Sequence, residues 1–486
     1  MDATELRATA GTAIEALAAY AATSAAGGGP AVARRPPAVV MESLDLRRLV
    51  REGGLDARSF GDWLERYLAD STRLHHPGEL AHQVGVPDTG SALADLVHGV
   101  ANQPMSIYEM GAAAAAVEQA VLDWMVEKVG WDPASSGGVL THGGSLANLT
   151  ALLAARAKAA PDAWGAGAPG DLAILAPPSA HYSIARAAGI LGIGADAIVP
   201  LEVDALERVR VDRLADALAR VRAAHRRPLA LVAAACATST GLHDDLRGIG
   251  EFCREHGIWL HVDGAHGASA LLSESLRGLL AGIELADSVV WDAHKMLRTS
   301  ALCAAVLVRR RADLPAAFQQ HASYLDFDNP HGFDAIDRQV ECTKSELGLK
   351  LFLCLAFRGE RGLAAYVEEQ HAKTLAFWEL LRRRAGFEAP YRPESNILCF
   401  RYGATGAVQA AIREALLEAG DFHLSSAEIA GERYLRVAVM SPATDAGTFE
   451  RLLDAIEAVA QPAAASAPPR SARHRLGADA PRLAAS

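Results

Sequence analysis

Short apolar runs and longer amphipathic stretches alternate along the middle of the chain. The runs DLAILAP and GIWLHVD carry a charged residue only at one end, and helical stretches such as DDLRGIGEFCREHG lie between runs of this kind. A strand that is buried on both faces reads as a continuous apolar run. Strands that alternate with helices are typical of a parallel sheet. The pattern predicts an α/β fold with a mostly parallel sheet and helices on both of its faces.

The pattern changes on either side of this region. Residues 1–20 predict an amphipathic helix, not a secretory signal, because charges interrupt the weakly apolar stretch. Residues 21–37, rich in Ala, Gly and Pro, predict a linker. Further on, two helical stretches precede NILCFRY and RYLRVAVM, which read as strands of a smaller α/β block. We expect an N-terminal helical segment with its linker (1–106), a large domain (107–385), a small C-terminal domain (386–460) and a disordered tail (461–486).

Composition excludes several classes of function. The chain has 486 residues, of which 50% are hydrophobic, and its formal net charge is −11. An acidic protein has no basic field for nucleic acid or anionic lipid, and no apolar run is long enough to span a membrane. Six cysteines are scattered without a CxxC pair, which predicts reduced thiols and a cytoplasmic location.

Four segments place reactive side chains directly after a predicted strand. Ligands of open α/β sheets bind beyond the carboxyl ends of the strands, so the four segments are expected to converge. In the first, THGGSLAN, Gly144 and Ser145 open a helix, where backbone amides and a hydroxyl favour phosphate. The alternative is an ordinary helix start with Ser145 as its N-cap.

The second and third segments carry a histidine and an aspartate. In PPSAHYS, His181 stands where an imidazole could stack on a flat ring, or could simply face solvent at a helix start. In HVDGAH, Asp263 ends a buried strand, and a carboxylate there calls for a cation as partner. A pyridinium N–H is one such partner. The competing interpretation is a metallohydrolase with His261, Asp263 and His266 as ligands.

The fourth segment, SVVWDAHK, places Lys295 between two apolar stretches. Lysine occurs at only six positions in the chain, so a lysine in this setting is notable. Such a side chain either extends its amine to solvent or forms an imine with a carbonyl compound. Its place after a strand favours the imine.

Taken in order, the motifs GGS, AHYS, HVDGAH and DAHK resemble those of the group II decarboxylases that use pyridoxal-5′-phosphate (PLP). This family includes glutamate and aromatic amino-acid decarboxylases, and the likeness extends from about Ile107 to Val439. It implies the fold-type I architecture of aspartate aminotransferase and a large PLP-binding domain. It also implies a homodimer with its active sites at the interface. The implied reaction converts an L-amino acid into an amine and CO₂.

The resemblance also implies roles for individual residues. Lys295 would hold PLP as a Schiff base, with His294 beside it. Asp263 would pair with the pyridine nitrogen, and His181 would stack on the ring; His181 and His294 would join Lys295 as catalytic residues. Four further positions are implied as cofactor contacts, with no metal required: Gly144, Ser145, Asn148 and Thr238.

The sequence departs from the family pattern at three places, one of which is CTK (Cys342 to Lys344), where relatives often have Gly-Arg. Asp292 stands in DAHK where many relatives have the Asn of NPHK, close to the expected phosphate. In the loop after HASYL, Phe333 is the best match to the usual catalytic Tyr, although Tyr324 or His331 could supply the proton instead. A Phe at that position leaves open an aldehyde synthase, which decarboxylates and oxidatively deaminates its substrate with O₂. A non-catalytic scaffold is disfavoured, because all four motifs keep their reactive side chains.

Overall fold

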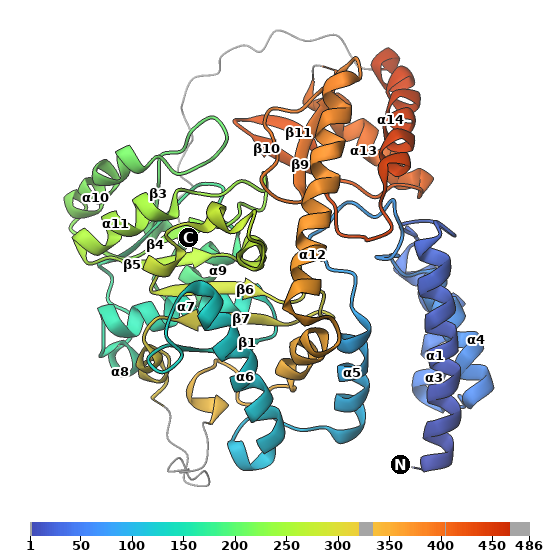
Figure 1. The fold of residues 1–486 in the computed structure, drawn as a ribbon, viewed down its shortest axis with the longest axis horizontal. Coiled ribbons are helices and arrows are strands. Elements are labelled where there is room, and N and C mark those ends of the chain that lie inside the picture. Colours follow the sequence, from blue (N-terminus) through green and yellow to red (C-terminus); the bar gives the residue numbers. More distant parts are fainter. Residues whose placement is uncertain (1, 320–333, 404, 467–486) are drawn as a thin grey trace, which may run out of the picture.

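The computed structural model describes residues 2–319, 334–403 and 405–466 (Figure 1). Its largest unit is a seven-stranded sheet with the strand order β1-β7-β6-β5-β4-β2-β3. The strands are β1 (Gly137–Thr141), β2 (Leu172–Ala176), β3 (Ile198–Pro200), β4 (Arg227–Ala234), β5 (Trp259–Asp263), β6 (Ser288–Asp292) and β7 (Ala304–Val308). Within this sheet only β7 runs antiparallel to its neighbours, β1 and β6. The predicted mostly parallel sheet is confirmed, and the carboxyl ends of the other strands share one edge.

Helices cover both faces of this sheet (Figure 1). They are α6 (Ala112–Val129), α7 (Gly144–Ala159), α8 (Ala163–Ala166), α9 (Ser183–Ile190), α10 (Leu214–Ala223) and α11 (Leu246–His256). Neighbouring strand residues join different cores, because side chains alternate across a strand. Val289 packs in the core with α6, α10 and α11, and Val290 packs in the core with α7 and α9. Burial on both faces explains why the strands read as continuous apolar runs.

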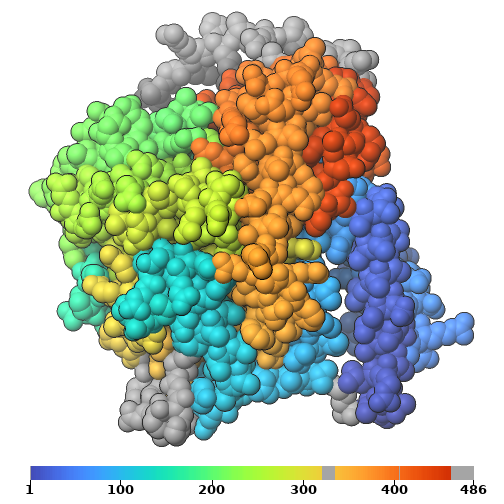
Figure 2. Space-filling view, in the orientation of Figure 1, coloured from blue at the N-terminus to red at the C-terminus, as the bar shows by residue number. Residues whose placement is uncertain are grey.

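A set of helices precedes the large sheet. They are α1 (Ala3–Ala25), α2 (Pro37–Ser43), α3 (Leu46–Glu52), α4 (Ala57–Ala69) and α5 (Thr89–Ala101). The predicted N-terminal helix is confirmed, but the linker predicted over 21–37 is partly wrong. Helix α1 continues through Ala25, because alanines favour helix, and the chain leaves it at Gly27 with a positive φ of 77°. Figure 2 shows α1 at one edge of the molecule.

The long helix α12 (Leu347–Arg383) connects the large sheet to the C-terminal unit (Figure 1). Its backbone breaks at Gly359, where φ is 67°, so the two helical stretches predicted from the sequence are confirmed as two segments. The C-terminal unit has an antiparallel sheet with the order β10-β11-β9-β8. Its elements are β8 (Phe387–Glu388), β9 (Ile397–Tyr402), α13 (Gly406–Ala419), β10 (Ser425–Ile429), β11 (Glu432–Ala438) and α14 (Ala446–Ser466).

Two features bear on the predicted boundaries. Leu80, from the N-terminal segment, lies in the core of the C-terminal unit, and Glu79 forms a β-bridge with His423. Helix α14 runs to Ser466, so the first residues of the predicted disordered tail are helical, and residues 467–486 lie outside the described part of the chain. Among the described residues, none of the helices is long and apolar enough to cross a membrane.

Candidate active site

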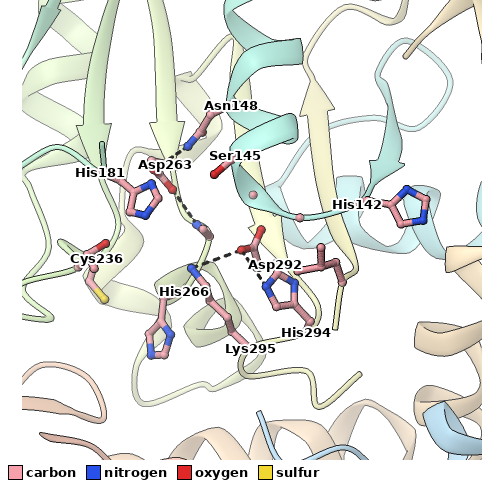
Figure 3. A pocket seen from close by; sticks show the side chains of 15 residues that line it. His142, Ser145, Asn148, His181, Cys236, Asp263, His266, Asp292, His294 and Lys295 are labelled. Carbon is pink, nitrogen blue, oxygen red and sulfur yellow. Dashed lines mark hydrogen bonds and ion pairs between the residues drawn. The ribbon is translucent and has the colours of Figure 1, made fainter. Parts of the chain in front are cut away.

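One cavity of about 300 Å³ lies beyond the shared carboxyl edge of the large sheet (Figure 3). Strands β1, β5 and β6 end at its wall, and the loop before α9 closes one side. All eight residues that the sequence analysis assigns to the cofactor line it: Gly144, Ser145, Asn148, His181, Thr238, Asp263, His294 and Lys295. Strand-end reasoning and the family resemblance together therefore named residues that are up to about 150 positions apart in the sequence and lie in one cavity.

The start of α7 forms one wall of this cavity. Gly143 is the N-cap, with a positive φ of 97° and no side chain to cap the helix, so the alternative role of Ser145 as N-cap is wrong. The first N–H groups of a helix have no partner within it and favour an anion. Gly144 also lies against Asp292: a Cβ at Gly144 would be 2.7 Å from Asp292 Oδ2. Only glycine fits beside this carboxylate.

We expect Gly144→Ala to destabilise the protein by about 1–3 kcal/mol, as overpacking of a filled site does. The backbone at Gly144 has no positive φ, so the strain in the variant comes from the contact with Asp292 and not from the backbone. Urea unfolding of the protein would measure it. Gly99→Ala in α5 is the matched control, because a Cβ there meets nothing within 4 Å. Equal free energies of unfolding for the two variants would contradict a steric conflict between a Cβ at position 144 and Asp292.

Asp263 is held rigidly at the end of β5 by neutral donors. Asn148 Nδ2 donates to Asp263 Oδ2 at 3.0 Å, and the N–H of Ala265 donates to Oδ1 at 3.2 Å. Asn148 is itself fixed, since its Oδ1 accepts from His261 Nε2 at 2.9 Å. The carboxylate is thus oriented but not neutralised by these contacts. A cation in the cavity would complete its pairing.

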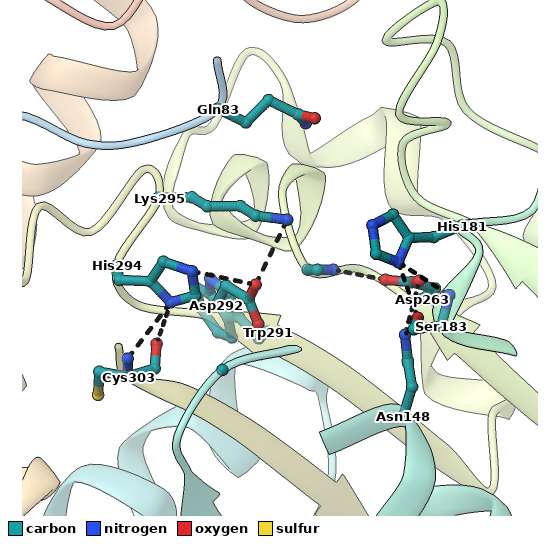
Figure 4. A network of polar contacts seen from close by, with 12 residues as sticks. Gln83, Asn148, His181, Ser183, Asp263, Trp291, Asp292, His294, Lys295 and Cys303 are labelled. Atoms are coloured by element: carbon teal, nitrogen blue, oxygen red, sulfur yellow. Dashed lines mark hydrogen bonds and ion pairs between the residues drawn. The ribbon is translucent and has the colours of Figure 1, made fainter. Parts of the chain in front are cut away.

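His181 lies next to Asp263 in the same wall (Figure 4). Its Nδ1 is 2.7 Å from Ser183 Oγ, which also accepts from Asn148 Nδ2 at 2.9 Å. The serine proton is therefore available for Nδ1, and the imidazole keeps its own proton on Nε2. Burial lowers the pKa of His181, so the ring is neutral near pH 7. A neutral, oriented imidazole suits stacking on a flat ring.

Lys295 sits in the turn that follows β6. Its Nζ is 3.3 Å from Asp292 Oδ2, and His294 Nε2 is 3.6 Å from the same oxygen (Figure 4). His294 Nδ1 donates to the carbonyl of Cys303 at 2.8 Å. Asp292 is 3% exposed, and burial raises its pKa, while the charges of Lys295 and His294 act in the opposite direction. The amine thus enters the cavity beside a single buried carboxylate.

The other buried lysines have structural partners. Lys344 Nζ lies 2.5 Å from Glu118 Oε1 and 2.6 Å from the carbonyl of Leu140, and it is fully buried. Lys350 Nζ pairs with Asp95 at 2.9 Å. Lys295 is the one lysine that lines the cavity. Its selection from the sequence is consistent with this geometry.

Several cavity residues were not predicted. His142, Cys236 and Leu302 also line the wall, and so does His266, which the sequence analysis named only as a possible metal ligand. His142 and Cys236 each follow a strand, β1 and β4, so the strand-end rule could have found them. His142 Nδ1 is 2.6 Å from Glu341 Oε1, and this long-range contact has no signal in the sequence.

The metallohydrolase interpretation does not fit this wall. His261 is fully buried and bonded through both ring nitrogens, to Asn148 and Ser288. His266 Nε2 is 2.6 Å from Asn396 Oδ1. In the described part of the chain no group of three or more His, Cys, Asp or Glu side chains is arranged to hold a metal ion. The predicted loop residues Phe333, Tyr324 and His331 lie outside the described residues.

Comparisons with known proteins find a matching family model, curated relatives and solved structures. The family described as "Pyridoxal-dependent decarboxylase conserved domain" matches residues 65–403. Human acidic amino acid decarboxylase GADL1 is 29% identical over 445 residues, which cover 87% of this chain and 85% of that protein. L-2,4-diaminobutyrate decarboxylase of Rhizobium meliloti is 32% identical over 393 residues, covering 78% and 77%. The crystal structure of mouse CSAD matches with a TM-score of 0.87 at 26% identity, covering 94% of this chain and 98% of that one.

Proposed function

Because this chain belongs to the pyridoxal-dependent decarboxylase family, and is therefore a PLP-dependent enzyme that decarboxylates an amino acid to an amine, we propose that Lys295 is the residue that bonds the cofactor. The fold is the fold-type I architecture that the resemblance implied. The observation that carries the proposal is the position of Lys295 Nζ. Among the described residues Lys295 is the one lysine that lines the cavity, and its Nζ lies 3.3 Å from Asp292 Oδ2.

Three features of the cavity fit PLP. The turn at Gly143 and the start of α7 offer backbone N–H groups to a phosphate. The Asp263 carboxylate, held by neutral donors, calls for a cationic N–H such as a protonated ring nitrogen. The Lys295 amine can bond an aldehyde. We propose that Ser145 and Thr238 complete the contacts at the phosphate and the cofactor's edge.

The chain's own residues then have separable tasks. When bound, PLP supplies an electron sink for the carbanion left when CO₂ departs. Asp263 keeps a negative charge where the ring nitrogen would lie, and Asn148 fixes the direction of that carboxylate. His181 presents a neutral ring to one side of the cavity, and Lys295 Nζ can carry a proton at the reacting centre. His294 anchors the turn that presents Lys295 through its bond to Cys303.

We also propose a position for a carboxylate of the substrate. Arg436 is buried, and its partners are uncharged: the carbonyls of Ala81 and Ser239, Ser425 Oγ, and Gln83 Oε1 at 3.1 Å. Figure 4 shows Gln83 on the far side of Lys295 from β6. Gln83 Nε2 is buried with no partner in the described structure. A buried donor beside an unneutralised guanidinium is the chemistry that binds a carboxylate.

We also propose that the protein is a homodimer, that it is cytoplasmic, and that its domains have the boundaries expected from the sequence. Helix α1 exposes Ile14 and Leu17, and α5 exposes four apolar side chains: Leu93, Leu96, Val97 and Val100. Exposed apolar clusters of this kind favour contact with a second chain. All six cysteines are unpaired, which supports a reducing compartment.

We expect the purified protein to carry PLP on Lys295. Borohydride reduction should fix the cofactor covalently, and peptide mapping should find it on Lys295. With PLP and a panel of L-amino acids that includes acidic members and 2,4-diaminobutyrate, the protein should release CO₂ and the matching amine. An adduct on Lys344 or Lys350 would refute the assignment.

Product analysis under air separates the amine from the aldehyde route. Amine alone, without O₂ uptake or ammonia, is the expected outcome. Stoichiometric aldehyde, ammonia and peroxide would show the oxidative reaction instead, and Phe333→Tyr should then shift the product towards amine.

A further inference from the structure

The Asp292 carboxylate occupies the place in the cavity that an anion would approach. It ends β6 and lies against the first residue of α7, so that a Cβ at Gly144 would be 2.7 Å from Oδ2 and 2.9 Å from Oδ1. The start of this helix is also the anion-binding turn of the proposed function. An ionised carboxylate and a phosphate at one turn repel each other in a buried site.

The hydrogen bonds around Asp292 are incomplete while the carboxyl is ionised. Oδ1 is buried and has no partner in the described structure. His294 Nε2 lies 3.6 Å from Oδ2, which is too far for a hydrogen bond. The ionised carboxylate therefore keeps one buried oxygen without a donor, and a neutral carboxyl costs less to bury there.

Lys295 is the group that balances the negative charge. Its Nζ lies 3.3 Å from Oδ2, and the other titratable groups that act on Asp292 are His294, Asp263 and His181. Once bonded to the cofactor, Lys295 no longer offers this free ammonium. The carboxylate would then be left with a weaker counter-charge and an added anion nearby.

We propose that Asp292 takes up a proton from solvent when the cofactor's phosphate binds at Gly144 and Ser145, so that the affinity for PLP falls as pH rises. This rests on the proposed function, and it assigns a pH response to the residue that departs from the family pattern. Before binding, Asp292 is the ionised partner of Lys295. After binding, it is a neutral carboxyl that tolerates the phosphate. Burial, which raises the pKa of Asp292, favours the neutral form.

The test compares PLP affinity of the cofactor-free protein across about pH 6.5 to 8.5 for the wild type and Asp292→Asn. Asparagine keeps the shape and cannot ionise. The ratio of the wild-type Kd to the variant Kd should rise with pH, by up to about tenfold per pH unit, as for linkage to one proton. Calorimetry in buffers of different ionisation enthalpy should find about one more proton taken up by the wild type.

Two controls test whether the pH dependence requires the phosphate and whether it requires a carboxylate at position 292. Pyridoxal, which has the aldehyde but no phosphate, should give a Kd ratio that changes less with pH than the ratio for PLP, because it removes the free ammonium of Lys295 without adding an anion. Asp287 directly precedes the first residue of β6, and its carboxylate pairs with Arg309 at 2.6 Å. The Kd of Asp287→Asn for PLP should depend on pH as that of the wild type does.

Kd ratios for PLP that stay constant with pH, with PLP still mapped to Lys295, would overturn this inference alone. A Kd ratio for pyridoxal that rises with pH as steeply as the ratio for PLP would also overturn it. A wild-type protein that binds no PLP at any pH would overturn the proposed function, and this inference with it.

Discussion

Lys295→Ala is expected to lose decarboxylation by at least about 10³-fold while the protein still folds, because the variant removes both the proposed attachment point and a proton carrier at the reacting centre. The fold should survive, since the contact of Nζ that the structure describes is with Asp292 and the side chain faces a cavity. The freed carboxyl can become neutral, as burial already raises its pKa. Single-turnover CO₂ release and thermal unfolding would measure the two effects separately.

A matched control for this variant is Lys158→Ala. Lys158 lies in a different cavity, where its Nζ is 5.7 Å from the centre of the Trp259 ring, so its loss should leave turnover close to that of the wild type. Reduction with borohydride should leave no PLP bonded to Lys295→Ala. Turnover within about tenfold of the wild type, with PLP still covalently bound, would contradict the proposed role.

Much of the fold was predictable because strands of the large sheet that are buried on both faces consist of continuous apolar residues. Strands β2, β5 and β6 lie where the apolar runs DLAILAP, GIWLHVD and DSVVWD are. The direction of β7 was not predictable, since an apolar run reads the same in either direction. Strand β10 was missed because its residues 425–428 are only partly buried or exposed, and a half-exposed strand has a weak apolar signal.

The candidate site was predictable to the extent that its residues end strands. Asp263 ends β5 and Lys295 follows β6, and parallel strands bring their carboxyl ends to one edge. Asn148 was implied only by family resemblance, and its contacts with Asp263 and His261 depend on how α7 packs on the sheet. Gln83, which we propose for binding the substrate, could not be found, because it belongs to the N-terminal segment and its bond is with the distant Arg436. Tertiary contacts of this kind have no local pattern.

Asp263→Asn is expected to raise the barrier by about 3–5 kcal/mol, the range for breaking a buried charge pair. That corresponds to a fall in turnover of roughly 10²- to 10⁴-fold. Asparagine keeps the size of the side chain, and its Oδ1 can still accept from Asn148 or from the N–H of Ala265. What it removes is the charge that would keep the ring nitrogen of PLP protonated, and with it the pull on the carbanion.

Asn148→Ala is the comparison that separates charge from orientation. It leaves the Asp263 charge in place but removes the donor 3.0 Å from Oδ2, so its effect on turnover should be smaller, about 1–3 kcal/mol. Both variants should still bond PLP through Lys295, which borohydride mapping can verify. If Asp263→Asn instead kept near-normal turnover with PLP in place, the carboxylate would have no electronic part in the reaction. Equal losses in the two variants would assign Asp263 to positioning alone.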